Sequence, residues 1–438
     1  MLKGKTLSGL MLLALCGTSL YTLSLASAGG SAVPATSTPA TSTPVTTTIA
    51  AADAQTRKVV AAADAFLATL SAAQKKAVLF AFTDATQRKN WSNFPLGGPG
   101  ANRKGVKWGD LSAPQRAALM TLLGTVLSPA GLDMVKGQML ADDLIRATDQ
   151  GQGPAGAQAG AGQAGPGAGA VPASGAQTAA PGTTQPSGTA QPGGSAAQLP
   201  AAAPAGGPPA GNQPAGSRPA VSFGSDYYFV SFVGTPSTTS PWMLQFGGHH
   251  LALNATVVGP NITLSPSLTG GEPIKVSFNG QTYTLVPQVP LEMQAAEKLL
   301  ASLTAAQKAK AVVSSTRTDL VLGPGHDGQV LQPEGLPASA MTAAQKTQFL
   351  ALIRARLGIL NADDLVQKMT AIQKNLDRTY FAWFGPTAAG NAAYFRVTGP
   401  TLILEFAPQA NDGDPANHLH NMYRDPTNEY GAAWTSLK

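Results

Sequence analysis

Two stretches of the chain carry apolar residues at the spacing of an amphipathic helix, and they resemble each other. AADAFLATLSAAQKKAV at residues 62–78 aligns with AAEKLLASLTAAQKAKA at residues 295–311. Each is followed further along by a second helical segment that opens with Ser or Thr three residues before Gln. This spacing is the capping box of a helix N-terminus. The repetition predicts two copies of one helical unit, at residues 54–147 and 291–378.

The segments between and after these units are rich in aromatic and β-branched residues, which is typical of strands. The clearest examples are SDYYFVSFVG, WMLQFGGHHLALNATVVG and LILEFA. Asn279-Gly280 is a two-residue hairpin signal, and a second hairpin turn is expected near Gly399-Pro400. The pattern predicts an α+β fold in which two related helical units flank or pack on an antiparallel β-sheet.

Three segments lack both patterns. Residues 1–28 have a basic start, an apolar run and the small residues Ala26–Ala28, the layout of a secretory signal peptide. Residues 29–53 are rich in Ser, Thr and Pro, which indicates a solvated stalk. Residues 148–221 consist almost entirely of small and polar residues, so a disordered Gly/Ala/Pro-rich linker is expected. The C-terminal α+β part with the second helical unit then covers residues 222–438.

The leader also decides the cysteine chemistry. Cleavage after Ala28 removes Cys16, the single cysteine, so the mature chain has no disulfide and no thiolate metal site. A lipid anchor at Cys16 is the alternative, but the bulky Leu15 stands where lipoprotein signals have a small residue. We expect a secreted protein, periplasmic or extracellular, with an extracellular substrate of unknown identity and no integral membrane span after cleavage. A formal net charge of +6 without a basic stripe argues against nucleic acid as a partner.

Four of the five histidines fall in two short motifs, GGHH with His249 and His250 and NHLH with His418 and His420. Imidazole is the commonest metal ligand, and His-x-His on an extended segment directs both rings to one side. The adjacent His249 and His250 would face opposite sides of a regular strand. Only one of them is expected to reach the metal, with His250 favoured, unless Gly247-Gly248 forms a bulge that redirects them.

Three imidazoles with an open fourth position suit catalytic zinc and also copper. His326 in GPGHDGQ is a candidate fourth ligand on a Gly-rich loop. Glu405, isolated in the apolar LILEFA, is a candidate ligand, general base or partner that orients an imidazole. Arg424 is a candidate catalytic residue, although a role as counter-charge for Glu405 or Asp425 fits the pattern equally well.

These motifs resemble those of the domain-of-unknown-function family numbered 3500. The resemblance rests on WMLQFGGHHLALNATVVG, FAWFG, and LILEFAPQ with NHLHNMYRDPTNEYG, and it covers roughly residues 55–147 and 222–438. The low-complexity residues 151–219 depart from the compact family pattern. The resemblance implies no established reaction, so function has to be argued from the site.

Two functions from different classes follow. The first is a secreted metalloenzyme, either a zinc-type hydrolase with Glu405 as possible base or a copper-type oxidoreductase. The alternative is a non-catalytic metal-binding or ligand-binding envelope protein, which a closed four-ligand site would favour. A structural module whose histidines bind nothing is the third possibility. Serine hydrolase, nucleotide-binding and zincin functions are disfavoured, because the ordered regions lack the G-x-S-x-G, Walker and H-E-x-x-H motifs.

Overall fold

The computed structural model describes residues 49–98, 100–149, 221–390, 392–409 and 414–435. The predicted leader and nearly all of the predicted stalk and linker lie outside these residues. Runs of helices are followed by runs of strands along the described chain, which confirms the predicted α+β class. None of the helices in this part of the chain has both the length and the apolar character that a membrane span needs.

The first half begins with helices and ends with strands. In chain order it contains α1 (Ala54–Thr69), α2 (Ala72–Val78), β1 (Leu79–Phe80), α3 (Ala85–Arg88), β2 (Val106–Lys107), the 3₁₀ helix η1 (Trp108–Asp110), α4 (Ala113–Val126), α5 (Pro129–Asp149), η2 (Ser225–Tyr227), β3 (Phe229–Val233), β4 (Trp242–Gly248), β5 (Leu251–Val258), β6 (Asn261–Thr263) and β7 (Ser267–Gly271). A small separate hairpin follows, formed by β8 (Lys275–Phe278) and β9 (Gln281–Thr284).

The second half repeats this order, without counterparts of α3 and β6 in the described residues. It contains α6 (Gln288–Ser302), α7 (Ala305–Ala311), β10 (Val312–Ser314), β11 (Leu336–Pro337), η3 (Ala338–Ala340), α8 (Ala343–Leu357), α9 (Ala362–Lys374), η4 (Leu376–Arg378), β12 (Tyr380–Phe384), β13 (Tyr394–Gly399), β14 (Leu402–Pro408), β15 (Leu419–Arg424) and η5 (Glu429–Gly431). The repeated order of elements therefore extends beyond the helices into the strands that follow them.

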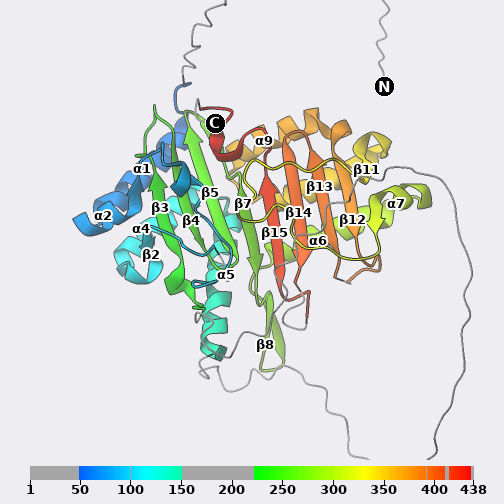
Figure 1. Cartoon of the computed structure of the whole chain (residues 1–438), viewed down its shortest axis with the longest axis horizontal. Helices are drawn as coiled ribbons and strands as arrows, with labels where there is room; N and C mark the ends of the chain where they lie inside the picture. Colours follow the sequence, from blue (N-terminus) through cyan, green and yellow to red (C-terminus); the bar gives the residue numbers. More distant parts are fainter. Residues whose placement is uncertain (1–48, 99, 150–220, 391, 410–413, 436–438) are drawn as a thin grey trace, which may run out of the picture. The chain divides into compact units, whose positions relative to one another are not determined.

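Thirteen strands of the described chain form one sheet, whose main path runs β1-β3-β4-β5-β7-β15-β14-β13-β12-β10. β7 and β15 meet at its centre as antiparallel neighbours, so each half of the chain supplies one half of the sheet (Figure 1). The expectation of an antiparallel sheet is correct for the inner strands. It is wrong for the outermost pairs, β1 with β3 and β10 with β12, which are parallel. Parallel pairing needs a long crossover, which α4 and α5 supply in one half and α8 and α9 in the other.

Both predicted hairpin turns are present. Asn279 and Gly280, with φ of 50° and 74°, join β8 to β9. These two left-handed residues are what a type I′ turn requires. Pro400 and Thr401 join β13 to β14, since Gly399 pairs with Leu402.

Equivalent residues in the two halves make equivalent contacts. The Gln115 side chain donates to the Thr69 carbonyl and to Gln74, over 2.9 and 3.0 Å. In the second half Gln345 donates to the Ser302 carbonyl and to Gln307, both over 2.9 Å. The chain is thus built from two copies of one α+β unit that share a sheet, which matters for the sites described below.

The two faces of the sheet are covered differently. Helices pack on one face, where side chains such as Phe232 and Leu244 join the helix residues in the larger core. Loop segments cover the other face, where Met243 and Met422 pack with Trp91 and Tyr430 in a smaller core. Figure 1 shows these loops crossing in front of the central strands. The centre of the sheet is therefore enclosed on both sides.

Candidate metal centre

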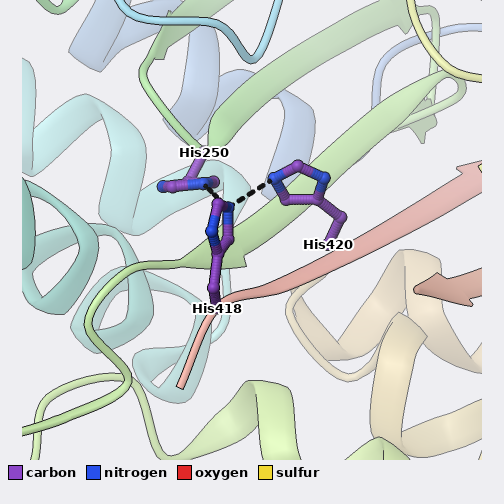
Figure 2. A group of neighbouring side chains, drawn as sticks. All are labelled: His250, His418 and His420. Atoms are coloured by element: carbon purple, nitrogen blue, oxygen red, sulfur yellow. Dashed lines mark hydrogen bonds between the residues drawn. The ribbon is translucent and has the colours of Figure 1, made fainter. Parts of the chain in front are cut away.

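Three histidines converge where the β4–β5 turn meets the start of β15 (Figure 2). Nε2 of His418 lies 2.9 Å from Nε2 of His250 and 3.2 Å from Nε2 of His420. Nitrogen ligands held at about 2.0–2.1 Å by a tetrahedral zinc ion lie roughly 3.3 Å from one another. Both contacts of His418 therefore come within a few tenths of an ångström of the spacing that one metal ion imposes, and the ligand atoms of all three histidines lie within 4.8 Å of one another.

The strand register explains why these residues meet. His420 on β15 pairs with Gly270 on β7, and Leu251, which follows the β4–β5 turn, pairs with Thr269 on the other side of β7. The turn and the start of β15 are thus held on either side of the end of β7. A Cβ on Gly270 would lie 2.3 Å from the Leu419 carbonyl oxygen, so the close packing beside His420 requires glycine.

His250 occupies an unusual backbone position. It is the second residue of the two-residue turn between Gly248 and Leu251, and its φ is 58°. Left-handed φ at this place in a turn favours Gly or Asn, and other residues adopt it at a cost of roughly 1–2 kcal/mol. Backbone strain of this kind persists where the surrounding structure enforces it, and it is concentrated at functional sites.

Hydrogen bonds from several elements enforce the turn. The His250 N–H donates to the Asn93 carbonyl over 3.0 Å, and the His250 carbonyl accepts from Gln138 on α5 over 3.2 Å. Gln138 also donates to the Gly270 carbonyl over 2.6 Å, so one side chain ties the turn to β7. The Gly248 carbonyl accepts from Arg103 over 2.8 Å. A Cβ on Gly248 would lie 2.5 Å from the Tyr228 ring, which explains the second glycine of GGHH.

His249 has a different role from its neighbour. Its Nδ1 lies 2.8 Å from Oδ1 of Asp142 on α5, and its carbonyl accepts from the Tyr228 hydroxyl over 2.7 Å. Its ring lies against that of His250, with ring centroids 3.7 Å apart. The Asp142 carboxylate therefore orients the His249 ring, which in turn supports the ring of His250.

A carboxylate lies beside the three histidines. Oε2 of Glu272, directly after β7, is 3.5 Å from Nδ1 of His418 and 3.9 Å from Nε2 of His250. Its side chain is 22% exposed, more than those of His250 and His418 at 4% and 10%, so the centre reaches solvent on this side. Sequence analysis did not single out Glu272, because the residue becomes significant only when β7 is paired with β15.

The environment keeps the imidazoles neutral. Burial lowers the pKa of His250 well below its usual range, and the neighbouring His249, His420 and His418 lower it further. Burial also lowers the pKa of His420 well below its usual range, and His418 and His249 add to the effect. Neutral imidazole is the form that binds metal ions, so these rings need to lose no proton before they ligate.

His326 is not part of the cluster. It is half-buried in the segment between β10 and β11, where its Nδ1 lies 3.1 Å from Oε1 of Gln329. The described part of the chain has two groups of converging ligand atoms, His250 with His418 and His420, and His249 with His250 and Glu272, and His326 belongs to neither. A Gly-rich loop can hold a polar residue without forming a site.

Glu405 and Arg424 also lie outside both groups and hold a loop on the sheet. The two carboxylate oxygens of Glu405 accept the N–H groups of Val321 and Leu322 over 2.7 and 2.9 Å. Arg424 donates to the carbonyls of Leu322 and Gly323, both over 2.9 Å. Burial raises the pKa of Glu405 while these backbone hydrogen bonds oppose the rise. Glu272, not Glu405, is therefore the carboxylate that adjoins the histidines.

The family model described as "Protein of unknown function (DUF3500)" matches residues 52–432, and the chain belongs to this family. The match confirms the resemblance seen in the sequence. Both histidine motifs and all helices and strands from α1 to η5 lie within the matched range. No curated protein and no solved structure matches the chain.

Proposed function

We propose that this protein binds one divalent transition-metal ion, zinc or copper, through His250, His418 and His420. The convergence of the three Nε2 atoms carries the proposal. A neutral imidazole has one N–H group and one nitrogen lone pair. Hydrogen bonds between the rings alone cannot stabilise three converging nitrogens as well as one cation that accepts all three lone pairs.

Glu272 supports the tautomer that metal binding needs. Its Oε2 lies 3.5 Å from Nδ1 of His418. A carboxylate beside Nδ1 favours the tautomer of His418 in which Nδ1 carries the hydrogen. The lone pair of Nε2 is then directed at His250 and His420. Carboxylate, histidine and metal in this order are a common arrangement in zinc sites.

The donor set favours zinc or copper among the common metals. All three candidate ligands are imidazoles, which suit zinc and copper, whereas calcium and magnesium take oxygen ligands. Three protein ligands leave a fourth position open on the side of the partly exposed Glu272. The leader-like residues 1–28 support a secreted location, where no cytosolic thiols compete for the metal.

Hydrolysis is the reaction that the surroundings favour. A bound zinc ion would act as a Lewis acid and lower the pKa of a water molecule. Glu272 is placed to take a proton from that water and to return it to the leaving group, since its carboxylate adjoins two of the imidazoles and reaches solvent. Asp142 and Gln138 would keep His249 and the turn of His250 in position.

A non-catalytic metal-binding protein is the second candidate. The deep burial of His250 and His418, with side chains only 4% and 10% exposed, favours it, because a substrate must reach a catalytic metal. The two candidates share the same ligands and differ in whether Glu272 takes part in a reaction.

Metal analysis of untagged protein tests the proposal. After treatment with a chelator, zinc and copper titrations followed by calorimetry are expected to show one ion bound per chain. The double variant His418→Ala, His420→Ala should lose at least 100-fold in affinity, whereas the control His326→Ala should bind like the wild type. Equal affinity in the wild type and the double variant would refute the metal centre.

A further inference from the structure

The metal centre has a counterpart in the second half of the chain. Gln138 on α5 donates to the carbonyl of His250, and Lys368 on α9 donates to the carbonyl of Thr401 over 2.7 Å. Both acceptors are the second residues of two-residue turns, between β4 and β5 and between β13 and β14. Thr401 thus stands where the first half has His250.

The strand register extends the comparison to the other ligands. Ala252 pairs with Leu268 on β7, and the equivalent Ile403 pairs with Arg424 on β15. Leu268 and Arg424 are therefore equivalent positions. His418 lies six residues before Arg424, and Ile262 lies six residues before Leu268, so these two residues correspond. In the same way His420 corresponds to Leu264, each four residues before the reference position. At the counterpart position the three imidazoles are therefore replaced by the hydroxyl side chain of Thr401 and two apolar side chains, which cannot hold a metal ion in the same way.

A cavity of about 300 Å³ lies at this counterpart position, at the opposite end of β7 and β15 from the histidines. Ile262, Leu264 and Thr401 line it together with Lys368 on α9. Leu357, Ile359 and Trp434 add further apolar walls. The volume is at the lower end of the roughly 300–1,000 Å³ typical of ligand pockets. Most of the exposed wall is apolar, and the polar lining includes the carboxylates of Asp364 and Asp425.

Arg356 provides an unusual charge in this cavity. The residue lines the cavity and is only 1% exposed. One of its terminal nitrogens donates to the carbonyl and the hydroxyl of Ser267, over 2.9 and 3.0 Å. Its Nε has no hydrogen-bond partner, and the residue forms no ion pair with any described carboxylate. A buried guanidinium without a counter-charge is costly, which indicates that an anion belongs beside it.

The acidic residues nearby do not supply that anion. The charges of Glu292 and Arg356 interact, but burial raises the pKa of Glu292 to about 8, so Glu292 is protonated at neutral pH. Asp425 pairs with Lys368 over 2.5 Å. The two oxygens of Asp364 accept from the Ile262 N–H and from Asn361, over 2.8 and 2.7 Å.

We propose that this cavity binds a small organic monocarboxylate, with its carboxylate at Arg356 and its apolar body against Ile262, Leu264 and Trp434. One unpaired cation among mostly apolar walls suits a single negative charge, whereas a phosphate would need more donors. At about 30 Å³ for the volume of one water molecule, the cavity holds a ligand of about ten heavy atoms. The site is independent of the metal centre and of the function proposed for it.

Calorimetry with the full-length protein and a series of monocarboxylates from acetate to octanoate, with benzoate, tests this assignment. The best member is expected to bind with a Kd of roughly 10 μM to 1 mM, a range suited to ligands of this size. The matching uncharged amide should bind at least tenfold more weakly. The Arg356→Met variant should lose at least tenfold in carboxylate affinity.

Because removal of a buried arginine can impair folding, a second pair of variants keeps the charge. Ala371→Phe places a ring into the cavity from α9, and Thr370→Phe makes the same change on the exposed side of that helix. Only Ala371→Phe should abolish carboxylate binding. The His418→Ala, His420→Ala variant should bind carboxylate as the wild type does. The assignment is overturned if no member of the series binds saturably at millimolar concentration, or if both Phe variants bind equally.

Discussion

Left-handed φ at a histidine lowers the stability of the fold, so it is expected where the imidazole has a function. His250 has φ of 58° in a two-residue turn, where Asn is tolerated and β-branched residues are not. The surrounding hydrogen bonds to Asn93 and Gln138 fix the backbone whatever side chain is present. The strain and the metal ligand can therefore be separated by two substitutions at one position.

His250→Asn and His250→Val are both expected to lose at least 100-fold in zinc affinity. In the metal-free protein, His250→Asn should leave the free energy of unfolding within about 1 kcal/mol of the wild type, because Asn adopts left-handed φ. His250→Val should lower it by about 2 kcal/mol or more. Urea unfolding with chelator present measures both, and equal stability of the two variants would show that the turn carries no strain.

A substitution at Glu272 distinguishes the hydrolase from the non-catalytic metal-binding protein. Glu272→Gln removes the proton acceptor and keeps the size of the side chain. It is expected to retain the metal and to lower the rate of 4-nitrophenyl acetate hydrolysis by about 100-fold or more, the usual contribution of a general base. Metal-loaded wild type that hydrolyses this ester no faster than metal-free protein would favour the non-catalytic candidate.

Glu405→Gln is the informative comparison for that experiment. Both carboxylate oxygens of Glu405 accept backbone N–H groups of the loop at Val321 and Leu322. The amide can replace only one of these acceptors, so the variant should unfold at lower urea concentration and keep its ester hydrolysis per bound metal. Loss of hydrolysis with metal content and stability intact would instead assign the base to Glu405.

The sequence contained part of this centre and not the rest. Period-two geometry predicts that His418 and His420 face one way, and their Nε2 atoms lie 3.2 Å apart. The same geometry predicts opposite directions for His249 and His250, which is wrong, because the two residues form a turn and their ring centroids lie 3.7 Å apart. Nothing local distinguishes Glu272, which follows two glycines in an otherwise unremarkable loop. Its proximity to His418 depends on the pairing of two strands that are far apart in the chain.

At the scale of elements, α5 acts as the support of the metal centre. Its Gln138 side chain joins the carbonyls of His250 and Gly270, which belong to the two backbone segments beside the histidines. Gln138→Ala should lower zinc affinity about tenfold without removing a ligand, as loss of an outer partner typically does. Lys136→Ala, on the exposed side of the same helix, is the control. Equal affinity in both variants would show that the turn is held without α5.

Helix starts were predictable at this scale, whereas strand order was not. Capping boxes at Ser112 and Thr342 begin α4 and α8 where the Ser/Thr and Gln pattern indicated. The same motif at Ser71 and Thr304 begins α2 and α7, and so divides the two stretches expected to be single helices. These signals are local, since the cap and its partner are three residues apart. β7 has the sequence SLTGG, which is too short and too poor in large apolar residues to predict the central strand of a sheet. Its place is set by tertiary pairing with β5 and β15.

At the scale of the molecule, the long linker interrupts a connection that the other half makes directly. In the second half a single residue, Asn375, separates α9 from η4. In the first half the residues on both sides of the linker contact each other, because Arg146 pairs with Asp226 over 2.8 Å and Asp142 accepts the Gly224 N–H over 2.9 Å. The two ends are therefore held together by the folded part itself.

Replacement of residues 151–219 by a Gly/Ser loop of about ten residues, which spans roughly 17 Å, should leave the fold intact. Metal stoichiometry and Tm are expected to equal those of the full chain, measured by elemental analysis and circular dichroism. Scrambling the order of residues 151–219 is the control and should also change neither quantity. Loss of metal in the shortened chain alone would show that the linker contributes to the centre.

A buried acid beneath the central strands should make the stability of the whole molecule depend on pH. Glu292 on α6 is 4% exposed and accepts from Asn421 on β15 over 2.7 Å. Asn421 in turn accepts from Thr269 on β7, so the acid lies at the junction of the two halves. Burial raises the pKa of Glu292 from 4.5 to about 8, and the facing Arg356 opposes the rise only in part.

The sign of the effect follows from the two pKa values. Between about pH 4.5 and 8 the folded chain holds a proton on Glu292 that the unfolded chain has released, so the free energy of unfolding falls as pH rises. The slope is at most about 1.4 kcal/mol per pH unit, and it vanishes above the folded pKa.

Glu292→Gln keeps a neutral acceptor for Asn421 and cannot titrate. The difference in unfolding free energy between this variant and the wild type should therefore grow in the variant's favour from pH 5 to 8. Urea unfolding at each pH measures it, and Glu297→Gln, half-buried on the same helix, should run parallel to the wild type. Parallel profiles for Glu292→Gln as well would mean that Glu292 is ionised in the folded protein, in which case Arg356 has its counter-charge and the carboxylate site loses its main support.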